Sequence, residues 1–359
     1  GVRIMAYTNI DDPSAYFQIK LWTGTGSSQT VNFDGNSDLQ ADWIWHKEHD
    51  DTNGWHQTDT SIGIANYLAT QDGAAEYGVG SAYVSGIGSN SISYGGGDSS
   101  FNSNSVEQAT WAWKANGGST SSNTDGDLTS TVQVNSTAGF SIITYTGKNP
   151  IEPLDIGHGL GEVPDVFIIK NRDRTANWGV YHKDLTSPAE NRNLKLNLTN
   201  AEAAESTFWR NEAPTSTIIK TGENASVNVA NEDFVAYAFA EKQGYSKFGK
   251  YVGNASADGT FVYTGFQPAF VMIKTISTTD DWYVFDNKRA GYNPAVFRLR
   301  PNTTGSQTTG TNNTVDHLSN GFKLRFTGGS INGSGLTYIY MAFAEHPFTT
   351  STGVPTTAR

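Results

Sequence analysis

The chain of 359 residues contains 24 Lys and Arg against 35 Asp and Glu, which gives a formal net charge of −11. This acidic balance excludes nucleic acid as an expected partner, because Lys and Arg must neutralise phosphate, and no apolar run is long enough to predict membrane insertion. With no cysteine there is neither a disulfide nor a thiolate site. Only 16% of residues are charged and 38 are glycine, a profile typical of an all-β protein with many polar turns.

Residues 1–15 form a short N-terminal arm that precedes the first recognisable repeat. Three apolar residues in or next to this arm, Ile10, Tyr16 and Phe17, have no evident strand partner within the repeats. We therefore predict that the arm docks onto a neighbouring subunit, where these side chains become buried.

The rest of the chain is a threefold repeat. Three anchors recur: a strand that ends at glycine (21–24, 144–147, 250–253), an apolar strand that ends at lysine (40–47, 163–170, 267–274) and a closing strand (109–115, 235–241, 339–345). A tryptophan follows each lysine after eight residues: Trp55, Trp178 and Trp282. So many anchors at nearly constant offsets indicate homologous modules. We place them at 16–116, 140–245 and 246–348.

Each module is predicted to consist of short strands. The closing segments alternate large and small side chains with period two, and the apolar runs at 166–169 and 271–273 are typical of strands covered on both faces. The strand density predicts a two-sheet sandwich, jelly-roll or lectin-like, in each module. The predicted fold is thus all-β, with three tandem β-sandwich modules. Residues 199–210 (TNAEAAESTFWR) give the one helical pattern.

The connecting segments differ in composition. Residues 117–139 are dominated by Gly, Ser, Thr and Asn and predict a flexible or surface-draped linker between modules 1 and 2. Modules 2 and 3 are joined by only a few residues, so we expect them to pack against each other. The Thr-rich tail, 349–359, is predicted to be loose.

The repeated tryptophans have two possible roles, a buried keystone between the sheets or a surface platform for sugars. After Trp178 and Trp282 the pattern alternates so that Trp and Val share a face. Because Val is a typical core residue, we predict that the tryptophans are buried.

Several segments resemble tandem-repeat virion proteins of marine tailed phages, and the resemblance covers nearly the whole chain. They are 5–18 (MAYTNIDDPSAYFQ), 23–45, 113–126 (WKANGGSTSSNTDG), 157–173 (GHGLGEVPDVFIIKNRD), 178–183 (WGVYHK), 244–266 and 338–348 (YIYMAFAEHPF). The resemblance implies a virion component such as a fibre, an adhesin or another surface appendage. It implies no particular chemistry.

One cluster combines imidazole and carboxylate groups within eleven residues: His46, His49, Asp50, Asp51 and His56. On a strand that runs into a loop, His46 and His49 point to opposite faces, which is poor geometry for one metal ion. Ile169 and Ile273 replace His46 in the other modules. We interpret the cluster as a solvated loop and expect no metal site there.

No catalytic residues are predicted. The adjacent carboxylate pairs at 11–12, 50–51 and 280–281 diverge in extended structure, whereas glycoside hydrolysis needs two carboxylates that face each other. Glu241 and Glu345 recur after the closing strand, which suits a structural salt bridge or a cap. The glycine loop at 157–161 lacks the Lys of a phosphate-binding loop. We expect no cofactor; bound Ca²⁺ at loops 34–38 or 254–259 is an alternative, although turn chemistry alone accounts for these loops.

Aromatic residues outside the repeated strands are the candidate binding residues, because nine Trp and sixteen Tyr exceed what three modest cores require. The candidates are Tyr67, Tyr77, Tyr83, Tyr94 and Tyr292. Exposed rings of this kind stack on sugar faces; packing between modules or subunits is the alternative that the sequence leaves open.

The sequence and the resemblance together predict a non-enzymatic virion structural protein on the surface of the phage particle. We expect it in a tail fibre or another host-recognition appendage, with the tail favoured over the head. Its expected partners are other virion subunits and a host cell-surface glycan or protein, and a homo-oligomer, with a trimer favoured, is the expected assembly. A capsid-surface decoration or cement protein is the first alternative, and a carbohydrate-active tailspike enzyme is the second.

Overall fold

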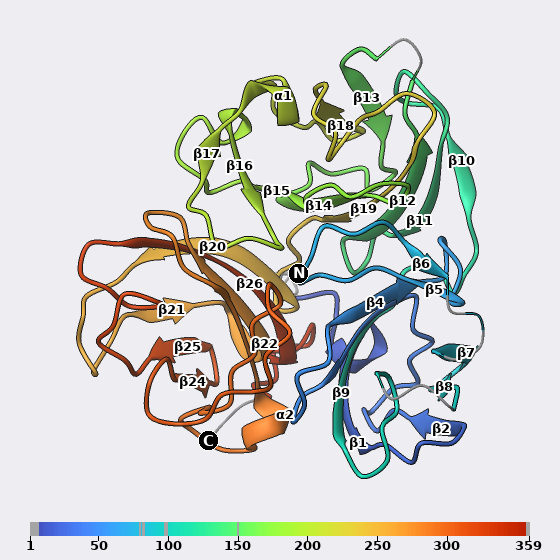
Figure 1. Cartoon of the computed structure of the whole chain (residues 1–359). Helices are drawn as coiled ribbons and strands as arrows, with labels where there is room; N and C mark the ends of the chain where they lie inside the picture. The colour runs from blue at the N-terminus through green and yellow to red at the C-terminus, as the bar shows by residue number, and fades with distance from the viewer. Residues whose placement is uncertain (1–6, 79, 81–82, 97–99, 149–150, 357–359) are drawn as a thin grey trace, which may run out of the picture.

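The computed structural model describes residues 7–78, 80, 83–96, 100–148 and 151–356. The fold is all-β, as predicted: antiparallel sheets dominate, and the described helices are single turns (Figure 1). Figure 1 shows three lobes around a common centre, coloured blue, green and orange in chain order. None of the helices in the described part of the chain has the length and hydropathy needed to cross a membrane.

A four-strand antiparallel core with the same strand order forms the centre of each lobe. In module 1 the order is β1 (Phe17–Thr23), β9 (Glu107–Trp113), β3 (Trp43–Glu48) and β4 (His56–Asp59). In module 2 it is β12 (Phe140–Thr146), β19 (Asp233–Phe239), β14 (Val166–Asn171) and β15 (Gly179–His182). In module 3 it is β20 (Ser246–Val252), β26 (Thr337–Pro347), β22 (Phe266–Thr275) and β23 (Trp282–Asp286). The repeated segments of the sequence are these strands.

Smaller sheets provide the second layer. They are β2 (Gln29–Asn32), β8 (Ser91–Tyr94) and β7 (Val84–Gly88) in module 1, β13 (Leu154–Gly157) and β18 (Ile218–Thr221) in module 2, and β21 (Phe261–Tyr263), β25 (Gly321–Leu324) and β24 (Val315–Leu318) in module 3. A two-stranded sheet joins β5 (Asn66–Tyr67) to β6 (Tyr77–Gly78). In module 3, for example, Val271 of the central sheet and Phe322 of the small sheet belong to one buried cluster, so the two layers enclose a core.

The other face of each central sheet points to the middle of the molecule. Trp113, Phe239 and Phe343 occupy the same position of the closing strand in the three modules, and all are buried. The ring centroid of Phe343 lies 5.5 Å from that of Trp113 and 5.7 Å from that of Phe239. The three modules therefore share one aromatic core. Burial on both faces explains the continuous apolar runs in β14 and β22.

The repeated tryptophans connect the modules in a cycle. The indole N–H of Trp55 in module 1 donates to a backbone carbonyl of module 3, that of Trp178 in module 2 to module 1, and that of Trp282 in module 3 to module 2. The accepting carbonyls belong to Arg300, Ala69 and Lys195, at N···O distances of 3.0, 3.0 and 3.1 Å. The tryptophans are buried, as predicted, but they lie between modules and not between the two sheets of one module.

The acceptors of these bonds occupy equivalent positions as well. Each accepting residue comes directly after a leucine. That leucine pairs, within its own module, with the residue two positions after the tryptophan of that module: Leu68 with Gln57, Leu194 with Val180 and Leu299 with Val284. Each interface thus repeats the same contact between a tryptophan of one module and a short paired segment of the next. We call this set of three bonds the tryptophan ring.

A buried lysine is the last residue but one of β3, β14 and β22. The ammonium groups of Lys47, Lys170 and Lys274 donate to backbone carbonyls, and those of Lys170 and Lys274 reach the neighbouring modules at Gly73 and Thr199. Burial lowers the pKa of each of these three lysines to about 8. The lysine that marks each repeat in the sequence is therefore a structural residue.

Three predicted segments differ from the structure. Within 117–139, predicted as a linker, β10 (Ser121–Asn123) and β11 (Ser130–Asn135) extend the sheet of module 2 beyond β12. The predicted helix at 199–210 forms only β17 (Ala203–Ala204), which pairs with β16 (Arg192–Lys195), and the single turn α1 (Ser206–Trp209). In the tail, Thr349 bridges to Pro355, so its described part is folded; 357–359 lie outside the described residues.

Ile10, Tyr16 and Phe17 pack within this chain, so they give no reason to expect the arm to dock onto a neighbouring subunit. Ile10 and Phe17 are buried in the shared core, and the ring of Tyr16 packs edge-on against Tyr245 with centroids 5.9 Å apart. Asp12 caps the turn η1 (Pro13–Ala15) and so directs the chain into β1. The described part of the arm is therefore bound to its own chain, while residues 1–6 lie outside the described residues.

Candidate functional site

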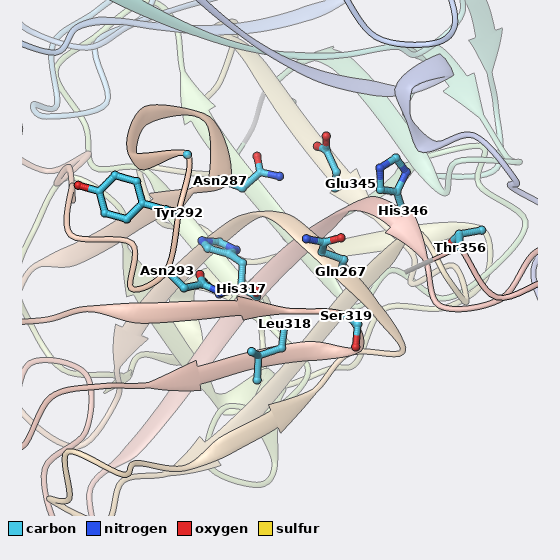
Figure 2. A pocket seen from close by; sticks show the side chains of 11 residues that line it. Gln267, Asn287, Tyr292, Asn293, His317, Leu318, Ser319, Glu345, His346 and Thr356 are labelled. Carbon is cyan, nitrogen blue, oxygen red and sulfur yellow. Dashed lines mark hydrogen bonds between the residues drawn. The ribbon is translucent and has the colours of Figure 1, made fainter. Parts of the chain in front are cut away.

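A cavity of about 720 Å³ opens on the surface of module 3 (Figure 2). Its wall comes from the start of β22, the ends of β24 and β26, the turn α2 (Asn287–Ala290) with the loop after it, and Thr356 of the tail. Its size lies in the range of small-molecule sites. The lining side chains are mostly polar: Gln267, Asn287, Tyr292, Asn293, His317, Leu318, Ser319, Glu345, His346 and Thr356.

The turn α2 places Tyr292 at the mouth of this cavity. The carboxylate of Asp286 caps the turn by accepting from the backbone N–H groups of Lys288 and Arg289. Gly291 ends it at φ +70°, a conformation that glycine adopts without strain, and the chain then reverses. Tyr292 follows with 68% of its surface exposed. Figure 2 shows Tyr292 at one end of the group of lining side chains, with its hydroxyl turned away from the others, and Glu345 and His346 toward the other end.

Asn293 fixes the loop that carries Tyr292 to strand β24. Its side-chain amide donates to the backbone carbonyl of His317 at 2.8 Å and accepts from the backbone N–H of His317 at 2.9 Å. The Asn293 side chain thus exchanges one donated and one accepted bond with the backbone of His317, as a residue of a paired antiparallel strand does. The aromatic ring is thus exposed, but the backbone beneath it is held on a rigid element.

His317 supplies a neutral imidazole to the floor of the cavity. Its Nδ1 lies 3.0 Å from the carbonyl oxygen of Pro268, and because a carbonyl can only accept, Nδ1 carries the proton. Burial lowers the pKa of His317, so the ring is neutral near pH 7. Nε2 is consequently an acceptor, and it has no hydrogen-bond partner within the described part of the chain.

The wall of the cavity also carries the carboxylate of Glu345 and the amide side chains of Asn287 and Gln267. Glu345 accepts from the ammonium group of Lys288 at 3.3 Å. The side-chain oxygen of Asn287 has no partner among the described residues, and Gln267 lies beside His317 (Figure 2). A polar ligand with several hydroxyl groups has donors and acceptors to match on this wall.

Of the five candidate tyrosines, two are in the core and cannot present a ring to a ligand. Tyr83 and Tyr94 are fully buried in the sandwich of module 1, where their hydroxyl groups bond to His56 and Thr110. The Gly- and Ser-rich strands β7 and β8, which border these residues, form the second layer of that module. We expected exposed rings at Tyr83 and Tyr94, and their burial excludes that role.

The other three candidates reach the surface to different degrees. Tyr67 is half-buried and stacks on Tyr77, with centroids 4.8 Å apart and rings 11° from parallel, while Tyr77 is 39% exposed. This pair belongs to the small sheet β5–β6 of module 1. Tyr292 of module 3 is the most exposed of the five and is the one that lines the cavity described above.

The histidine cluster of module 1 is not a solvated loop. His46 and His56 face each other as a cross-strand pair of β3 and β4, and both are buried. Burial, together with the charge of Lys47, lowers the pKa of His46 to about 3. His49 contacts Asp50 at 2.9 Å. Among the described residues, no group of three or more His, Asp or Glu side chains is arranged to hold a metal ion.

The recurring glutamates take part in ion pairs, as their position at a strand end suggested. Glu241 pairs with Lys183 and Lys247, and Glu345 pairs with Lys288. Sequence reasoning missed His317, Gln267 and Asn287 as site residues, because neither spacing nor repetition marks them. The signal that was available is Tyr292 itself, an aromatic residue within a long irregular segment.

The comparisons with known proteins give one match. Residues 12–347, which span all three modules, match the family described as a domain of unknown function, DUF7483. No curated protein and no solved structure matches the chain. Because the match includes nearly the whole described structure, the chain belongs to the DUF7483 family.

Proposed function

We propose that this chain is a non-enzymatic virion structural protein of a phage tail appendage that binds a host cell-surface glycan in the cavity of module 3. The observation that carries the proposal is the exposed ring of Tyr292 at the mouth of a polar cavity of about 720 Å³. The virion context comes from the sequence resemblance. Other virion subunits are the proposed attachment partners.

The chemistry of the cavity supports a glycan as ligand. A sugar offers an apolar ring face and a rim of hydroxyl groups, which match an exposed aromatic ring with amide, imidazole and carboxylate groups around it. Asn293 holds the backbone next to Tyr292 in place before any ligand binds, which reduces the ordering cost of binding. The shared core and the tryptophan ring hold the loop on a rigid support.

The lining favours binding over cleavage. Glycoside hydrolysis uses two carboxyl groups on opposite sides of the scissile bond. Among the described residues that line the cavity, Glu345 is the single acidic side chain, and its carboxylate is paired with Lys288. A tailspike hydrolase is for this reason the weaker proposal.

The exposed tyrosine provides the test. We expect Tyr292→Ala to weaken adsorption of the purified protein to host cells at least about tenfold, the usual loss when a central aromatic anchor is removed. Tyr263→Ala is the matched control, because it removes a tyrosine of the same module that is 55% exposed and lies outside the cavity, so it should retain adsorption. Equal adsorption of Tyr292→Ala and wild type would rule out this cavity as the receptor site.

A capsid-surface decoration protein is the second candidate, and one observation favours it. Three equivalent modules surround one centre, so the chain has the pseudo-threefold form that suits a threefold position of a capsid. Immunogold labelling of intact particles separates the candidates. Label at the tail alone supports host recognition, whereas uniform label on the head supports decoration. Light scattering of the purified chain decides whether it also forms a trimer.

A further inference from the structure

A second, smaller cavity adjoins the first across the boundary between modules 3 and 1. It measures about 200 Å³, and Glu345 and His346 belong to the walls of both cavities. Its far side is formed by module 1, at the start of β1 and at the loop 34–36. The two cavities thus lie next to each other, with Tyr292 at one end and the module 1 loop at the other.

The module 1 end is held as firmly as the Tyr292 end. The side-chain amide of Gln18 donates to the carbonyls of Ser14 and Ser37 at 2.9 and 2.8 Å and accepts from the N–H of Gly35 at 2.8 Å. The hydroxyl of Ser37 also donates to Asp12 at 2.6 Å. Both ends of the pair of cavities are therefore fixed before a ligand arrives.

The charges around the two cavities favour a neutral ligand. The one cationic side chain in the described lining, Lys288, is paired with Glu345, and Asp34 at the far end is paired with Lys20 at 2.8 Å. An anionic sugar would meet these carboxylates with no unpaired cation among the lining residues. His317 adds no positive charge, because its ring is neutral, and its free Nε2 can only accept.

An acceptor without a partner selects for ligand groups that carry a proton. A carboxylate or a phosphate has no proton to donate to Nε2 of His317, whereas every sugar hydroxyl has one. Nε2 of His317 is buried and unpaired before any ligand binds, so a ligand that donates to it gains a hydrogen bond that a ligand without donors does not. An acidic sugar also carries hydroxyl groups, so this contact favours a sugar as the ligand, while the preference for a neutral sugar rests on the charges.

We infer that the two cavities together bind an extended neutral oligosaccharide, with one sugar ring on Tyr292 and the chain continuing past Glu345 and His346 to the loop at Asn36 of module 1. This inference rests on the proposed glycan-binding function. It specifies that the ligand is a run of several neutral sugars and not a single sugar or an acidic one. The binding site is then shared between two modules that are far apart in the sequence.

The test combines ligand length with one substitution at each end. The probe is an array of bacterial surface oligosaccharides, neutral and acidic, in ladders from disaccharide to octasaccharide. We expect affinity to rise with length for neutral ladders. Tyr292→Ala should weaken binding at every length, whereas Asn36→Trp, which fills the module 1 end, should weaken only the longer members. Asn104→Trp is the control, since Asn104 is exposed on the same module and lies outside both cavities.

The outcomes separate this inference from the proposed function. If no ladder binds, the glycan-binding function itself is wrong. If glycans bind in a Tyr292-dependent manner but without length dependence, or if acidic ladders bind best, the function stands and the extended neutral ligand is wrong. Equal sensitivity of short and long members to Asn36→Trp would likewise overturn the two-module site.

Discussion

The inner faces of the three central sheets resemble one another more closely than do the outer layers, which cover the opposite faces of those sheets. The inner faces share equivalent residues: Trp113, Phe239 and Phe343 of the closing strands meet in one core, and each module donates one indole N–H to another module. The outer layers differ: among the described residues, the small sheet over the core has three strands in modules 1 and 3 and two in module 2, and module 1 also has the pair β5–β6. A residue that recurs in all three modules therefore serves to pack the modules against one another. Residues found in one module, such as Tyr292, are where binding is to be sought.

Among the substitutions that test this difference between inner and outer residues, Trp178→Ala is expected to lower the free energy of unfolding most. The change removes a fully buried indole and its bond to the carbonyl of Ala69 in module 1. We expect a loss of roughly 3–5 kcal/mol in the free energy of unfolding, as for other large-to-small core changes. Urea unfolding followed by tryptophan fluorescence and by circular dichroism measures it. An unchanged midpoint would show that the tryptophan ring does not stabilise the assembly.

Acid should destabilise module 1 through its buried histidines. The folded pKa of His46 is about 3, below the ordinary value of 6.5, because burial disfavours the imidazolium. Between those values the unfolded chain binds more protons, so the stabilising contribution is complete above pH 6.5 and is lost as the pH falls toward 3.

His46→Ile tests this directly, since isoleucine occupies the equivalent positions 169 and 273. We expect a shallower fall of the melting temperature between pH 6.5 and 4 in this variant than in wild type. Ile273→Val, a change in module 3 without a titrating group, should leave the slope as it is. Parallel curves for His46→Ile and wild type would contradict the pKa assignment.

A smaller effect is expected at the contact of modules 1 and 2. The hydroxyl of Tyr237 donates to the buried carboxylate of Asp59 at 2.7 Å, and burial raises the pKa of Asp59 to about 6. Tyr237→Phe should cost about 1–3 kcal/mol, because it removes a donor from a buried charge.

The cost of this change should depend on pH. Above about pH 6 Asp59 is ionised and the loss is complete, whereas at lower pH the carboxyl group is protonated and the loss shrinks. Thermal unfolding of both proteins at pH 5 and pH 8 measures the difference. A cost that grows on acidification would contradict the assigned direction.

The smallest effect on stability is expected at the periphery. Tyr292→Ala should change the free energy of unfolding by no more than about 0.5 kcal/mol, since 68% of the residue is exposed. Differential scanning calorimetry of the variant checks this. A large destabilisation would mean that the ring belongs to the scaffold, and the division between inner and outer residues would not hold.

The central strands could be predicted because burial on both faces keeps them apolar in every copy, so pattern and repetition agree. The strands β10 and β11 could not, because β10 lies exposed at a sheet edge and has no apolar face to mark it. Tyr83 and Tyr94 were misplaced for a related reason: their partners His56 and Thr110 come from other strands. The cavity depends on contacts between His317 and Pro268, 49 residues apart, and no spacing in the sequence encodes that.

The tryptophan ring also fixes how many modules such a chain can contain. In an open array of repeats, each unit contacts only its neighbours, and copies can be gained or lost at the ends. Here the first module donates to the third, so the chain closes on itself and has no terminal unit. A two-module or four-module descendant would leave an indole donor and an acceptor carbonyl unmatched and part of the aromatic core open to water. Duplication can therefore build such a protein once, but after closure its copy number is locked by geometry.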